Sequence, residues 1–176
     1  MRLFELPGIQ AVSSPALLER GCVHVIGLEP LRDRAGPRWE KMRGSVCARL
    51  EMILRQRLGP SDFFLPLDDV AYLVTMPGTE PEDAQITCLR ITYDLYVSYL
   101  GECNLDSICL YRARQADRNA IAVERIATEQ LETLAKRAGT SEGGNEPPKV
   151  PATRGQSADQ GTGINADVHF LPMWDA

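Results

Sequence analysis

The stretch Phe63-Phe-Leu-Pro-Leu-Asp-Asp-Val-Ala-Tyr-Leu-Val-Thr-Met76 decides the fold. Two apolar runs, Phe63 to Leu67 and Ala71 to Met76, flank the pair Asp68-Asp69. Because aspartate tolerates the backbone of a tight turn, this pattern predicts a β-hairpin. Pro66 has no amide hydrogen to donate, so we expect the first of the two strands to lie at a sheet edge or a bulge.

A strand and a helix are predicted ahead of the hairpin. The run from Cys22 to Leu28 is almost wholly apolar, which is typical of a strand that is buried on both faces. His24 lies within it, and we interpret this residue as a core histidine rather than a ligand. From Pro37 to Leu58, apolar residues recur at steps of three and four, which predicts an amphipathic helix. Gly59-Pro60 ends that helix.

A second helix is predicted from Thr79 to about Leu100. Thr79 and Glu82 have the spacing of a capping box, in which each side chain accepts a hydrogen bond from a backbone N–H at the start of the helix. Gly101 follows the last apolar position and is expected to end the helix. The run Ser107 to Ala113 then predicts another strand.

The segment after residue 117 has two interpretations. Residues Ala120 to Ile126 form either a short extra strand after a polar turn, or the first part of one long helix from Arg118 to Arg137. A helix from about Glu129 to Arg137 is common to both. With either ending, the order strand, helix, strand, strand, helix, strand predicts an α+β domain of the split βαβ type. Its antiparallel, ferredoxin-like sheet would carry the helices.

Composition divides the chain into four parts. Residues 1–21 are expected to be an N-terminal extension with a short helix beginning near Ser14, and residues 22–139 the folded domain. Residues 140–166 are rich in Gly, Ser, Thr, Pro, Asn and Gln, which predicts a flexible linker. Residues 167–176 are apolar again, and they predict a docking segment or the start of a truncated second domain. Its proposed docking residues are Phe170, Leu171 and Trp174.

Charge and composition argue against several classes of function. The net charge of −5 gives no indication of a basic face, so nucleic acid is not expected as a partner. No stretch approaches the roughly 18 apolar residues of a membrane span, and no export signal is detected, so the cytoplasm is the expected location. The five cysteines form no CxxC pair, and with only two histidines no zinc site is predicted. We expect reduced, buried thiols.

The hairpin also resembles a known family. The run Tyr72-Leu-Val-Thr-Met-Pro77, between a turn and a long helix, is similar to the segment that follows the signature of GGDEF diguanylate cyclase domains. The earlier helix ending Leu58-Gly-Pro-Ser-Asp62 resembles the segment before that signature. Leu131 to Gly139 looks like the family's closing helix. The resemblance spans roughly residues 22–139.

The departure from that family concerns its catalytic residues. With Tyr72 in the aromatic position, Asp68-Asp69-Val70-Ala71 stands where the resemblance implies Gly-Gly-Asp-Glu. Val70 and Ala71 cannot bind a cation. For the metal carboxylate of the family's first strand, only Glu29 is near. The resemblance therefore implies a degenerate domain that does not make cyclic di-GMP.

The end of the chain carries a second resemblance. Phe170-Leu-Pro-Met-Trp-Asp175 is similar to the opening strand of EAL phosphodiesterase domains, which often follow GGDEF domains. This implies that the chain is the front part of a longer signalling protein.

Three hypotheses of function follow. The first is a non-catalytic signalling module that contacts a protein partner or a neighbouring domain; it needs no cofactor, and a homodimer is left open. The second is a residual nucleotide or metal site with Glu29, Asp68 and Asp69 as its weak candidates, since hard cations prefer carboxylate oxygens. Against it, Asp68-Asp69 is also a good turn sequence. The third is an unrelated ferredoxin-like domain with a structural role. No nucleophile with a neighbouring base is recognised, so enzyme activity is not expected.

Overall fold

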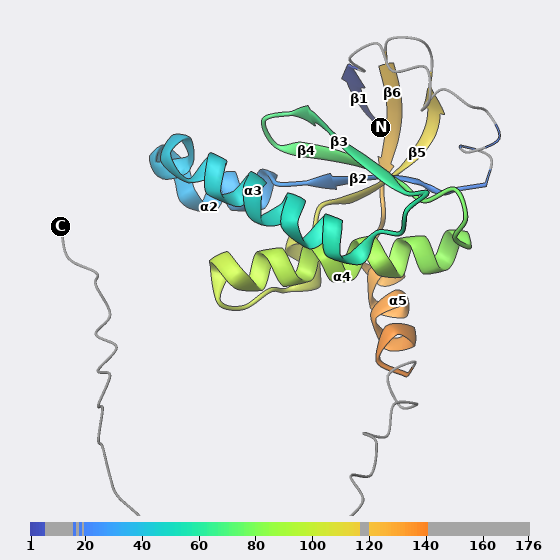
Figure 1. Ribbon diagram of the computed structural model, residues 1–176. Coiled ribbons are helices and arrows are strands. Elements are labelled where there is room, and N and C mark those ends of the chain that lie inside the picture. Colours follow the sequence, from blue (N-terminus) through green and yellow to red (C-terminus); the bar gives the residue numbers. More distant parts are fainter. Residues whose placement is uncertain (6–15, 17, 19, 117–119, 141–176) are drawn as a thin grey trace, which may run out of the picture. The chain divides into compact units, whose positions relative to one another are not determined.

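A computed structural model describes residues 1–5, 16, 18, 20–116 and 120–140 (Figure 1). At its centre is a six-stranded sheet in the order β1-β6-β5-β2-β4-β3, in which every neighbouring pair is antiparallel. The strands are β1 (Arg2–Glu5), β2 (Val23–Gly27), β3 (Phe63–Asp68), β4 (Ala71–Thr75), β5 (Leu110–Ala116) and β6 (Ala120–Arg125).

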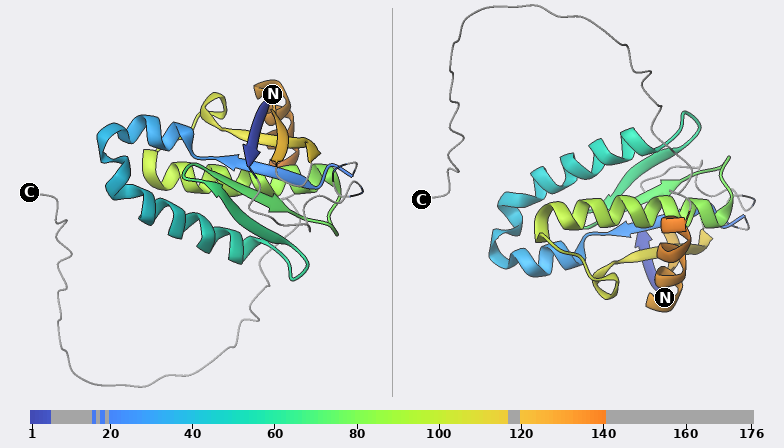
Figure 2. Two further views of the ribbon diagram at one scale, coloured as in Figure 1. Left: turned by 90° about the horizontal axis from the view of Figure 1, so that it is seen from above. Right: turned by 90° about the horizontal axis from the view of Figure 1, so that it is seen from below.

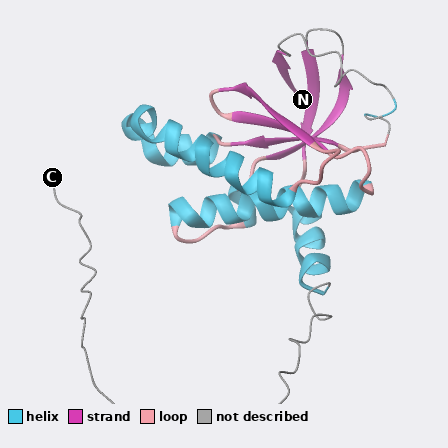
Figure 3. Cartoon of the chain, viewed as in Figure 1, coloured by secondary structure: helices cyan, strands magenta, loops and turns pink. Residues whose placement is uncertain are grey.

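The sheet is strongly curled, like one half of a barrel. In Figure 3, β1, β6 and β5 stand almost upright, whereas β2, β4 and β3 run across the view. The curl brings the two edge strands, β1 and β3, towards each other. Nη2 of Arg2 on β1 lies 3.7 Å from Oδ2 of Asp68 at the end of β3.

The helices cover the outer face of this sheet. They are α2 (Glu29–Ala35), α3 (Trp39–Arg57), α4 (Pro81–Leu100) and α5 (Thr128–Thr140), with short 3-10 turns η2 (Gly36–Arg38) and η3 (Leu105–Ser107). Figure 2 shows α4 along the sheet, with α3 on one side of it and α5 on the other. The predicted antiparallel α+β sheet with helices packed on it is thus confirmed.

Each face of the sheet has its own apolar core, because neighbouring residues of a strand point to opposite faces. On the helix side, Ile26 of β2 packs among buried residues of α3 and α4 such as Leu50 and Ile91. On the inner side of the curl, Val25 packs with Tyr111 and other buried residues of the strands. All five residues of β2 are buried, as its apolar sequence predicts.

The hairpin agrees with the prediction from its sequence. Strands β3 and β4 pair in antiparallel register, and the register shifts between Pro66 and Asp68. Strand β3 is an edge strand, and Pro66 is exposed on it. The proline therefore lies at an edge and beside a bulge, where its missing N–H costs no ladder hydrogen bond.

Two elements were missed. The N-terminal extension contains β1, whose partner β6 lies more than a hundred residues later, so no local pattern could predict the pairing. Helix α2 was also missed, and the predicted helix begins at Trp39 instead of Pro37. In α2, Pro30 lies in the first turn, where proline suits a helix start, and the buried residues are Leu31 and Ala35.

Three details of the second half need correction. The capping box is wrong: the N-cap of α4 is Glu80, without a side-chain cap bond, and the carbonyl of Thr79 accepts instead from Sγ of Cys22 at 3.4 Å. Residues Leu105–Ser107 form a 3-10 turn, so β5 begins only at Leu110. The long helix from Arg118 is wrong, and the alternative with strand β6 and helix α5 is correct.

Some predictions fall on residues outside the described part of the chain. These are the start of the N-terminal helix at Ser14, the linker 140–166 beyond Thr140, and the apolar segment 167–176 with Phe170, Leu171 and Trp174. Within the described part, none of the helices combines the length and apolar character needed to cross a lipid bilayer.

Candidate functional site

The candidate site lies where β2 ends and the β3–β4 hairpin turns. The N–H of Leu28 donates to the carbonyl of Val70 in the hairpin turn at 2.6 Å, and the N–H of Gly27 donates to the carbonyl of Cys109, just before β5, at 2.8 Å. Glu29 follows directly as the first residue of α2. The fold thus brings Glu29 and Asp68, two of the three predicted carboxylates, to the same end of the sheet.

Glu29 is held in a largely buried position. Only 14 % of its side chain is exposed. Its Oε1 forms an ion pair with Nη1 of Arg2 and lies 3.3 Å from the hydroxyl of Tyr111. Its Oε2 is buried and has no hydrogen-bond partner within the described residues. Burial raises the pKa of Tyr111, so at neutral pH its hydroxyl is protonated and donates to the carboxylate.

Gly27 makes room for this carboxylate. A Cβ at this position would collide with Oε2 of Glu29 and would lie 2.9 Å from Cβ of Cys109. The carbonyl of Gly27 also accepts a 2.7 Å hydrogen bond from the buried hydroxyl of Tyr96 on α4. The glycine is therefore required by close packing, with its backbone fixed from the helix side.

Arg2 lies between the two carboxylates. Besides its ion pair with Glu29, it approaches Asp68 and stacks over the ring of Phe4, with its guanidinium carbon 4.3 Å from the ring centre. Phe4 in turn packs edge to face against Tyr111, with ring centres 6.3 Å apart. A guanidinium that is held by two carboxylates and an aromatic face supplies positive charge where the resemblance implies a metal ion.

The two aspartates of the turn have different surroundings. Oδ1 of Asp68 accepts from the N–H of Val70 at 2.8 Å, a local bond typical of aspartate in turns. Asp69 is 75 % exposed, and its Oδ1 lies 2.8 Å from Nη1 of Arg43 on α3. Asp69 is thus not part of the Glu29–Arg2–Asp68 cluster, and the turn interpretation fits both residues.

The two residues at the positions where the resemblance implies an acidic pair are buried and apolar. Val70 is 6 % exposed and Ala71 is fully buried. Their side chains belong to opposite cores, Val70 on the helix side and Ala71 inside the curl. Neither offers an oxygen ligand at the turn.

Comparisons with family models, with curated proteins and with solved structures find no match to this chain. Any function proposed for the chain is therefore argued from the geometry and chemistry of its side chains.

The sequence analysis missed the residues that complete the cluster. Arg2 and Tyr111 reach Glu29 only through tertiary structure. The run Arg2-Leu-Phe-Glu5 has no alternation of polar and apolar residues, so there was no local signal for Arg2 in the sequence. Within the described part of the chain, no three His, Cys, Asp or Glu side chains lie close enough together to share a metal ion.

His24 lies in the helix-side layer and is fully buried, which agrees with its interpretation as a core residue. It stands opposite Arg112 in the β2–β5 ladder. Burial, and to a smaller extent the charge of Arg112, lower the pKa of His24 to about 4. At neutral pH the imidazole is therefore uncharged. Neither ring nitrogen has a hydrogen-bond partner in the described structure.

Proposed function

We propose that the chain is a non-catalytic module, of degenerate GGDEF type, that acts through contact with a protein. The observation that carries this proposal is the guanidinium of Arg2 between Glu29 and Asp68. Diguanylate synthesis needs metal ions to neutralise a triphosphate and to activate the attacking hydroxyl. A cation at this end of the sheet would first have to displace Arg2.

The sheet order supports the family assignment at the level of topology. Leaving out β1 and β6, the remaining strands lie in the order β5-β2-β4-β3. Helices α2 and α3 connect β2 to β3, and α4 connects β4 to β5. This order supports the proposed ferredoxin-like arrangement of two split βαβ units. Many functions use this arrangement, so it supports the fold assignment and leaves the function to the site.

The catalytic half of the proposal is tested by incubating the purified chain with GTP and Mg²⁺, and then with Mn²⁺. Pyrophosphate and cyclic di-GMP are measured by chromatography with mass detection. We expect no product above the level of a protein-free blank. The matched variants Asp68→Ala and Asp69→Ala should give the same result. Turnover in the unmodified chain that is lost in Asp68→Ala would overturn the proposal, because it would mean that the turn binds the catalytic metal.

A further inference from the structure

Positive charge is concentrated on one segment of this acidic chain. From Glu29 to Arg57 there are eight Lys and Arg against four Asp and Glu, a net charge of +4. Because the whole chain carries −5, all other residues together carry −9. The segment comprises α2, η2 and α3. Its charge is local, and the composition of the whole chain conceals it.

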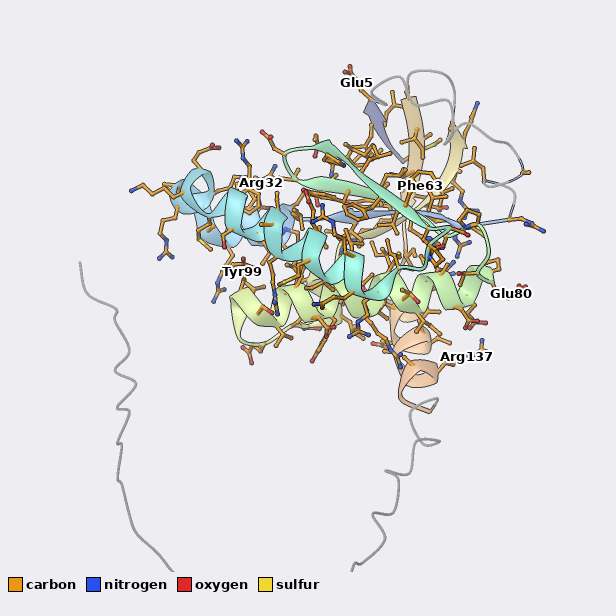
Figure 4. The ribbon with its side chains drawn as sticks, viewed as in Figure 1. Glu5, Arg32, Phe63, Glu80, Tyr99 and Arg137 are labelled. Atoms are coloured by element: carbon orange, nitrogen blue, oxygen red, sulfur yellow. The ribbon has the colours of Figure 1, made fainter. Side chains whose placement is uncertain are left out.

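Half of these cations form no ion pair in the described part of the chain. Four are paired with carboxylates: Arg32, Arg43, Arg55 and Arg57. The other four are exposed and form no ion pair with any described residue: Arg34, Arg38, Lys41 and Arg49. Figure 4 shows Arg32 on α2, at one end of this segment.

Three of the unpaired cations lie along one side of α3 and its start. Arg38, Lys41, Arg49 and Met52 are separated by steps of three, eight and three residues, which keeps them on one face at 100° per residue. From Arg38 to Met52 this face is about 21 Å long. We call these four residues the α3 ridge. Its length suits about four turns of a partner helix or about six residues of an extended segment.

A groove lies beside the ridge, between α3 and α4. Its volume is about 290 Å³, and its lining includes Arg49 and Ile53 from α3 and Tyr93 and Val97 from α4. Tyr93 is 44 % exposed, and Met52, one turn from Arg49, is 40 % exposed. They are two of the four large apolar side chains that are exposed in the described structure. The groove is at or below the roughly 300–1,000 Å³ of small-molecule sites, so it suits one side chain of a larger partner.

We propose that the α3 ridge and this groove bind an acidic segment of a partner protein, with one apolar side chain of that segment inserted into the groove beside Tyr93 and Val97. Carboxylates of the partner would pair with Arg38, Lys41 and Arg49. Exposed charges of this kind mainly set the rate and specificity of association, whereas a central apolar anchor supplies most of the binding energy.

The surroundings favour a protein segment over larger polyanions. The neighbouring helix α4 carries Asp83, and Asp94 lies in the groove itself, already paired with Arg57. Together with the −9 charge of the rest of the chain, these carboxylates would repel a DNA duplex or an anionic bilayer, which need a broad basic surface. A short acidic segment can follow the ridge without meeting them.

This inference rests on the proposed function, because it names the surface that makes the protein contact. The two have separate tests, so the inference can be wrong while the proposed function holds. The probe is a fluorescein-labelled helical peptide of 14 residues, made of Glu with Leu and one Trp at steps of three and four. A second peptide with Lys in place of every Glu is its control. Fluorescence anisotropy with the full chain should show binding of the acidic peptide only, weaker at high salt. GTP turnover tests the proposed function independently.

Two matched variants locate the contact. Arg49→Glu should weaken binding about tenfold, the effect of roughly 1.4 kcal/mol. Arg20→Glu makes the same change of charge at an exposed residue next to Gly21, which lies beside Pro81 at the start of α4, away from the groove at Tyr93 and Val97, and should change affinity less than about twofold. Equal melting temperatures would exclude unfolding as the cause. Binding that is unaffected by Arg49→Glu would overturn the inference. So would equal binding of the Lys peptide, or tighter Arg49-dependent binding of a DNA duplex or phosphatidylserine vesicles.

Discussion

At the end of the sheet, Arg2 lies between two carboxylates and over an aromatic ring, whereas along α3 the cations Arg38, Lys41 and Arg49 are exposed and form no ion pair with the residues that the structure describes. Both regions use arginine, but in different environments. A charge that is removed from water is costly unless it is paired, so the Arg2 cluster is tied to the stability of the fold. Exposed cations cost little and remain available to another molecule. Burial and pairing therefore separate structural charges from charges that can serve binding.

Acid titration of His24 would give the largest effect, because this group is buried and has no hydrogen-bond partner among the described residues. Its pKa is about 4 in the folded chain, against an ordinary value of 6.5. The folded state thus resists protonation. Stability is fully present above pH 6.5, falls as the pH drops below it, and the loss is complete below pH 4. We expect to lose about 2 kcal/mol by pH 5 and about 3 in all, measured by urea denaturation.

The control for this titration is the chain's second histidine. His24→Leu should flatten the stability profile between pH 7 and pH 5, whereas His169→Ala should leave it unchanged. If the His24→Leu profile keeps the full slope, the buried imidazole is not its source.

The next largest effect is expected from Gly27→Ala, which disturbs the close packing around the carboxylate of Glu29. The added methyl group would meet Oε2 of Glu29 and Cβ of Cys109. Overpacking of this kind costs roughly 2 kcal/mol. Gly44→Ala is the matched control, since its Cβ would have open space on the exposed side of α3. It should stabilise the chain by about 0.5–1 kcal/mol. Equal effects of the two changes in chemical denaturation would contradict the close packing at Gly27.

Removing Arg2 tests the charged cluster itself. Arg2→Ala leaves the carboxylate of Glu29 without its cation, and we expect a loss of about 1.5 kcal/mol. Hydrogen exchange of the β6 amides that pair with β1 should become faster. In the double variant Arg2→Ala/Glu29→Gln, the second change should restore part of the loss, because it removes the unpaired charge. Additive losses would mean that the two side chains do not interact.

The smallest effect on stability is expected on the α3 ridge. A triple variant with alanine at Arg38, Lys41 and Arg49 should unfold within about 0.5 kcal/mol of the unmodified chain. The same variant should lose binding of the acidic peptide. A large destabilisation would show that these cations hold the fold, and the contrast with the Arg2 cluster would disappear.

The sequence allowed the central elements to be predicted where a local pattern was strong. The continuous apolar run of β2, the apolar face of α3 and the paired aspartates of the hairpin each correspond to an observed element. Strand β1 has four residues and pairs with the distant strand β6, so its own sequence was too weak a signal. The start of α4 was misassigned because Pro81 makes Glu80 the N-cap, although Thr79 has the better capping side chain.

For the site, the sequence predicted the carboxylates but not their partners. Glu29 lies just after the end of β2 and Asp68 is the last residue of β3, so their positions at strand ends could be predicted. The structure brings both to Arg2 at the same end of the sheet. The separation of Asp69 from them depends on the twist of the turn towards Arg43, which no spacing rule contains. The α3 ridge was missed for another reason. The net charge of −5 is a sum over the whole chain and conceals the charge of +4 on residues 29–57. Which of these cations share a face becomes clear only once they are placed on a helix.

The pairing of Arg2 with Val123 across β1 and β6 has a consequence for synthesis of the chain on the ribosome. Strand β1 leaves the exit tunnel before its partner β6 has been synthesised, so it cannot pair until β6 emerges. Until residue 125 or so has emerged, the inner face of the curl lacks one wall and Glu29 lacks its cation. Contacts between residues so far apart form late, since closing the intervening loop is entropically costly. A nascent chain arrested before β6 should therefore stay sensitive to protease at its N-terminus, and release of the next few residues should protect it.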